Sequence, residues 1–83
     1  MKNDELKIEI LGSTNTGKST LLYLIKETLK EKGINVKFED IDFDNDEKRF
    51  DKHFRKNLNE RINMLKNRKI KISTKNIGLG SIN

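Results

Sequence analysis

A short run of glycines and hydroxyl residues that ends in lysine and serine carries the clearest chemical signal in this sequence. Gly12, Gly17, Lys18 and Ser19 have the spacing G-x-x-x-x-G-K-[ST], which is typical of a loop that surrounds phosphate oxygens with backbone N–H groups. The glycines let the backbone turn sharply and approach a phosphate, the lysine would bridge the outer phosphates, and the serine hydroxyl would ligate Mg²⁺. We therefore predict a nucleotide-phosphate site formed by Gly12, Ser13, Thr14, Asn15, Thr16, Gly17, Lys18, Ser19 and Thr20.

Acidic residues further along the chain are candidates for a second Mg²⁺ ligand or a catalytic base. Enzymes with such a loop anchor the metal with a carboxylate from another part of the fold. Asp40 is the first choice, as a metal ligand and as a partner of Lys18 in catalysis, and Asp42 is the second choice for the metal. The alternative interpretation is a solvated acidic loop that helps to start the next helix, because acidic side chains suit the N-terminal end of the helix dipole.

The segments around these residues show two different spacings of apolar side chains, which alternate along the chain. Apolar residues recur at every second position in three segments and at every third or fourth position in two others. This order predicts an α/β fold with a three-stranded, mainly parallel sheet, in which one face stays exposed or is hidden by self-association. We expect strands over residues 6–11, 35–40 and 69–74 and helices over residues 18–32 and 46–67.

Each predicted helix has one apolar side. The first would bury Leu21, Leu22, Ile25 and Leu29, with Lys26, Glu27, Lys30 and Glu31 in solvent, and would end at Gly33. The second would bury Phe50, Phe54, Leu58, Ile62 and Leu65. Its arginines could reach a phosphate, with Arg49 and Arg55 nearest to the site in sequence and Arg61 and Arg68 further away; the alternative is a basic, solvated helix face.

Residues 6–33 resemble the opening unit of P-loop NTPases, and the leucine-rich segment after Lys18 resembles small nucleotide-kinase-like members. The whole chain is similar in form to short P-loop proteins of phages and other mobile elements. The resemblance implies a single nucleotide-binding domain over residues 1–75 that holds ATP or GTP with Mg²⁺, followed by a flexible or partner-ordered tail over residues 76–83.

Composition limits the possible settings of the protein. Its 83 residues are only 33% apolar, so the core must be small, and the absence of cysteine excludes disulfides and thiolate metal sites. No apolar run approaches the roughly 20 residues that cross a bilayer, which favours a cytoplasmic protein without membrane contact. Residues 1–47 carry 7 basic and 11 acidic side chains (−4), whereas residues 48–83 carry 11 basic and 2 acidic ones (+9).

Three functions are compatible with these features. The first is a small regulatory or accessory nucleotide-binding protein with little or slow hydrolysis that acts through a protein partner or a homo-oligomer. The second is an active Mg²⁺-dependent NTPase or nucleotide-kinase-like phosphotransferase. The third is a nucleic-acid-binding protein that uses the basic residues within 48–75.

Overall fold

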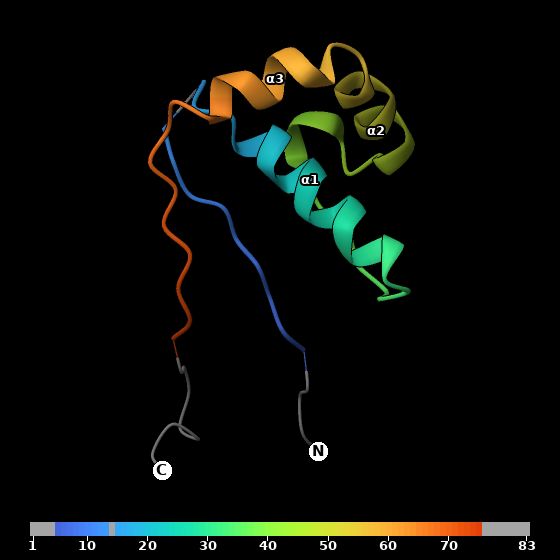
Figure 1. The fold of residues 1–83 in the computed structure, drawn as a ribbon. Coiled ribbons are helices and arrows are strands. Elements are labelled where there is room, and N and C mark those ends of the chain that lie inside the picture. Colours follow the sequence, from blue (N-terminus) through green and yellow to red (C-terminus); the bar gives the residue numbers. More distant parts are fainter. Residues whose placement is uncertain (1–4, 14, 76–83) are drawn as a thin grey trace.

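Helices form the regular structure of this protein. The computed structural model describes residues 5–13 and 15–75. Figure 1 shows α3 across the start of α1 and α2 beyond it, and both helices contact α1. The elements in chain order are α1 (Lys18–Glu31), the 3₁₀ helix η1 (Ile41–Phe43), α2 (Glu47–Arg55) and α3 (Leu58–Leu65).

The predicted α/β fold with a three-stranded sheet is wrong, because the described residues contain three α-helices and no strand. Residues 6–11, 35–40 and 69–74 lie outside the helices but form no sheet. Figure 1 shows the first and the last of these segments running away from the helices as extended chain. The first and last segments line a groove of about 850 Å³ and form no strand ladder with each other. The alternating pattern predicted strands but does not supply a pairing partner. Leu6 and Ile72 are accordingly 95% and 88% exposed.

The boundaries of α1 follow from two glycines with positive φ. Gly17, with φ 93°, precedes the first helical residue, and Gly33, with φ 80°, lies just beyond the last turn. The N–H of Ile34 donates to Leu29 O at 3.1 Å, and the N–H of Gly33 donates to Lys30 O at 3.0 Å. This pair of bonds is a Schellman motif, which explains why the helix predicted over residues 18–32 ends where it does.

Aromatic side chains between α1 and α2 form the core. Tyr23, Phe50 and Phe54 are buried, and Phe50 is completely inaccessible. The ring centroids of Phe50 and Phe54 are 4.7 Å apart, and those of Phe38 and Phe50 are 4.6 Å apart. These tilted contacts are typical of stable aromatic clusters. The partly buried residues around them are Leu22, Leu24, Phe38, Phe43 and Leu58.

The orientation of α1 differs from the prediction. Thr20, Tyr23 and Lys26 are its buried residues, whereas Leu21 and Ile25, predicted for the core, line the groove instead. Tyr23 packs against the aromatic residues of α2, so this face of α1 is the buried one. Lys26 lies about one turn further along the same face. The predicted solvent exposure of Lys26 is therefore wrong, since only 1% of its side chain is exposed.

Three carboxylates make the burial of Lys26 possible. Its Nζ lies 2.8 Å from Asp51 Oδ1, 2.8 Å from Glu27 Oε2 and 3.1 Å from Glu47 Oε2. Burial alone would lower the pKa of Lys26, but the hydrogen bonds to Asp51, Glu27 and Glu47 outweigh it and raise the pKa above its usual range. Lys26 is therefore charged in the folded protein and ties α1 to α2.

The single helix predicted over residues 46–67 is wrong, because it is divided into α2 and α3. Asp46 caps the start of α2 by accepting a hydrogen bond from Arg49 N at 3.2 Å. The chain leaves the helix at Lys56, with ψ 135°, and turns at Asn57, with φ 55°. Asparagine tolerates this left-handed conformation better than most residues, so the break needs neither glycine nor proline.

Candidate functional site

The loop before α1 is closed by contacts to one carbonyl oxygen. Lys18 Nζ donates to Ser13 O at 2.7 Å, and Thr16 Oγ1 donates to the same oxygen at 2.8 Å. Asn15, with φ 63°, and Gly17 take left-handed conformations in the turn. Thr14, which was predicted to bind phosphate, lies outside the described residues. The loop therefore folds back over the Lys18 side chain.

Both glycines of the motif lie where a side chain would collide with a neighbour. A Cβ atom at Gly12 would lie 3.0 Å from Thr16 Oγ1 and 3.5 Å from the Lys18 side chain. A Cβ atom at Gly17 would lie 2.7 Å from Leu65 Cδ2, in addition to the strain of its positive φ. The motif glycines thus allow the loop to close and allow α3 to pack against it.

The N-terminus of α1 is open to an anion. Within the described residues no side chain caps it, and its first turn contains no acidic residue. The first N–H groups of a helix have no partner inside the helix, and the helix dipole makes this end positive. Lys18, the first residue of α1, adds a full positive charge. Phosphate groups bind at helix ends of this kind.

The structure brings Ser19 and Asp40 together. Ser19 Oγ donates to Asp40 Oδ2 at 3.4 Å, on the flank of α1. Asp40 also caps η1, because its Oδ1 accepts a hydrogen bond from Asp42 N at 3.0 Å. The backbone N–H of Asp40 donates to Asn45 Oδ1 at 2.8 Å, which fixes the backbone at this position. Asp40 is thus both a helix cap and a neighbour of the predicted Mg²⁺ ligand.

Asp42, the second metal candidate, is exposed, and its backbone oxygen accepts from Arg49 Nη2 at 3.3 Å. Thr20, the last predicted phosphate contact, is buried with 4% exposure on the core side of α1.

Five of the predicted site residues line the groove: Gly12, Ser13, Thr16, Gly17 and Lys18. The phosphate loop therefore borders the groove, while Ser19 and Asp40 lie beside it.

The chemistry of Ser19 and Asp40 fits Mg²⁺. Mg²⁺ takes oxygen ligands at about 2.1 Å in an octahedron, so neighbouring ligand oxygens lie about 3 Å apart. The 3.4 Å between Ser19 Oγ and Asp40 Oδ2 would have to shorten slightly for both oxygens to bind one ion. Across the described part of the chain, no group of three or more acidic, histidine or cysteine side chains is arranged to hold a metal. Mg²⁺ commonly binds through one or two protein groups together with phosphates and water, which this pair would provide.

Sequence reasoning placed Arg68 far from the loop, but its side chain reaches it. Arg68 Nη2 donates to Asn15 O at 3.2 Å. Arg49 and Arg61, by contrast, lie over the rings of Phe43 and Phe54. A helix break predicted at Asn57 would have indicated that Arg68 can lie near the loop, because the break directs α3 across the start of α1.

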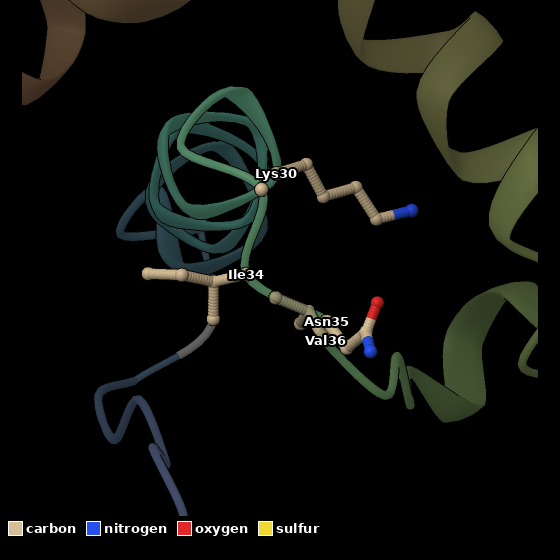
Figure 2. Close-up of a pocket in the computed structure, with 5 residues that line it drawn as sticks. Lys30, Ile34, Asn35 and Val36 are labelled. Atoms are coloured by element: carbon tan, nitrogen blue, oxygen red, sulfur yellow. The ribbon is translucent and has the colours of Figure 1, made fainter.

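A second hollow, of about 470 Å³, lies at the far end of α1 (Figure 2). Figure 2 shows Lys30 and Asn35 extending to one side of the chain and Ile34 to the other. A ligand site needs polar groups that converge on one point. This hollow lacks that arrangement in its lining, so the loop before α1 is the better candidate site.

Among residues 5–13 and 15–75, no helix combines the length and apolar character that a bilayer crossing requires. No protein-family model matches the chain, and neither curated proteins nor solved structures match it significantly.

Proposed function

We propose that this protein binds a nucleoside triphosphate, ATP or GTP, with Mg²⁺ through residues 12–19 and the start of α1, as a small regulatory or accessory protein. The observation that carries the proposal is that the carboxylate of Asp40 lies beside the hydroxyl of Ser19. Ser19 directly follows Lys18 in the sequence. The motif requires a metal-binding hydroxyl at Ser19, and the fold brings a carboxylate to that hydroxyl from 21 residues away.

The same contacts favour binding over rapid turnover. A general base must be free to accept a proton from the attacking group. Asp40 has one carboxylate oxygen bonded to Asp42 N and the other facing Ser19 Oγ. Both oxygens have a hydrogen-bond partner, and Mg²⁺ bound beside Ser19 would occupy a remaining lone pair of Asp40 Oδ2, which would leave Asp40 a poor base for activating water. We therefore expect little or slow hydrolysis.

Native mass spectrometry tests this proposal. The purified protein is mixed with equal concentrations of ATP and GTP in the presence of Mg²⁺, and the mass of the bound species is followed over hours. One bound triphosphate per chain that persists supports an accessory binding role. Conversion to a bound diphosphate supports the NTPase alternative instead. Absence of any nucleotide adduct contradicts the proposal.

A further inference from the structure

The end of α3 contacts the phosphate loop through one polar and one apolar side chain. Arg68 Nη2 donates to the carbonyl oxygen of Asn15 at 3.2 Å, across 53 residues of sequence. Leu65 packs directly against Gly17, because a Cβ atom at Gly17 would lie 2.7 Å from Leu65 Cδ2. Arg68 itself is fixed by a turn, in which its N–H donates to Leu65 O at 2.9 Å. Two neighbouring points of the loop are therefore held by one short segment.

The Asn15 carbonyl determines the direction of the next amide. No peptide bond in the described residues is cis. In a planar trans peptide the C=O of one residue and the N–H of the next point in opposite directions. The guanidinium of Arg68 attracts the Asn15 oxygen toward α3, and the N–H of Thr16 is consequently turned away from α3. Thr16 belongs to the loop whose amides are expected to meet phosphate.

We propose that Arg68 is a positioning residue of this loop: it holds the Asn15 carbonyl and so aims the Thr16 N–H at a bound phosphate. The inference rests on the proposed nucleotide site. Asn15 has φ 63°, a left-handed conformation that asparagine tolerates better than most residues but that its surroundings must still fix. A charged donor on its carbonyl supplies that restraint, because hydrogen bonds from ionised groups are the stronger ones.

The test compares ATP and ADP binding, each with Mg²⁺, by calorimetry for the wild type and three variants. Arg68→Ala removes the donor, Arg68→Lys keeps the charge and a donor group, and Lys52→Ala removes one positive charge from an exposed position in the last turn of α2. We expect Arg68→Ala to weaken both nucleotides by a similar factor, about fivefold. Arg68→Lys should recover most of the affinity, and Lys52→Ala should match the wild type.

A positioning role also predicts a spectroscopic signature. In NMR spectra, the amide resonance of Thr16 should shift on nucleotide addition in the wild type and shift much less in Arg68→Ala. Equal affinities for Arg68→Ala and the wild type would overturn the inference, while leaving the nucleotide site intact. A loss confined to ATP would also overturn it, because it would make Arg68 a direct ligand of the third phosphate. If the wild type binds neither nucleotide, the proposed function fails and the inference fails with it.

Discussion

Ser19 Oγ and Asp40 Oδ2 lie 3.4 Å apart, at the start of α1 and at the cap of η1. This separation is longer than a usual O–H···O hydrogen bond of about 2.7 Å. The contact is therefore weak in itself and more suitable for sharing a cation than for holding the fold together. It links the start of α1, directly after the glycine loop, to the acidic segment that begins at Asp40.

Asp40→Asn should reduce the effect of Mg²⁺ on nucleotide binding. Asparagine caps a helix as well as aspartate does, so η1 should survive, and only the charge beside Ser19 is lost. We expect affinity in the presence of Mg²⁺ to fall about tenfold, or ~1.4 kcal/mol, with little change when EDTA is present. Asp44→Asn is the matched control, because the Asp44 side chain is 83% exposed. Equal behaviour of the two variants in calorimetric titrations would remove Asp40 from the metal site.

Lys26→Met should be strongly destabilising. It leaves Asp51, Glu27 and Glu47 without the ammonium that neutralises them. These carboxylates are 16%, 40% and 30% exposed, so solvent offsets part of the loss, which we expect to be about 1–3 kcal/mol. For a domain of this size the melting temperature should fall by at least about 4 °C. Lys30→Met provides the comparison, since Lys30 also contacts Glu47 but has 42% of its side chain exposed. Thermal unfolding that ranks the two variants in the opposite order would disprove the role of Lys26.

Stability should fall in acid. The hydrogen bond from Lys30 lowers the pKa of Glu47 below its usual 4.5, and Lys26 adds to this effect against the opposing influence of burial. A lowered pKa gives stability that is present above pH 4.5 and is lost as the pH falls through the shifted value. The raised pKa of Lys26 acts at the other extreme, because its contribution is complete below pH 10.5. Between about pH 5 and pH 10 these two groups should leave stability unchanged.

Urea unfolding of Glu47→Gln at pH 7 and pH 3.5 measures this contribution. The variant should start less stable and lose less on acidification than the wild type. Glu31→Gln, at the exposed end of α1, should behave as the wild type does. Identical acid losses in Glu47→Gln and the wild type would exclude Glu47 as a source of the pH dependence.

Asn57→Ala and Asn57→Gly should have different effects on stability. Asn57 has φ 55°, where alanine is strained by about 1 kcal/mol and glycine is not. Alanine should therefore lower the melting temperature by about 4–8 °C, whereas glycine should change it little. Should alanine prove the more stable variant, the chain would favour one continuous helix across residues 56 and 57.

The sequence predicted local features well where one residue type determines the backbone. Gly17 and Gly33 have the positive φ values that the loop and the helix end require, and α1 lies between them. The spacing of Gly12, Gly17 and Lys18 predicted a phosphate loop before the helix, and in the structure Lys18 Nζ donates to Ser13 O within that segment. These features depend on contacts within a few residues, which a pattern can encode.

Contacts between segments that are distant in the sequence could not be predicted from these local patterns. Ile8 and Ile70 alternate with polar residues as strand residues do, yet they line a groove and make no sheet within residues 5–13 and 15–75. Lys26 was assigned to solvent because its charge suggested exposure, and its burial depends on three carboxylates from two helices. Arg68 reaches Asn15 only because Asn57 redirects the chain. Each of these outcomes depends on the positions of distant segments, which periodicity does not report.

Nucleotide binding itself provides the most direct test of the central claim. ATP with Mg²⁺ is titrated calorimetrically into the wild type, into Lys18→Ala, and into Lys48→Ala, which removes the same charge from an exposed position on α2. The claim predicts saturable binding of one nucleotide per chain, retained in Lys48→Ala and weakened at least about tenfold in Lys18→Ala. Absence of binding to the wild type, or equal affinities for the wild type and Lys18→Ala, would contradict it.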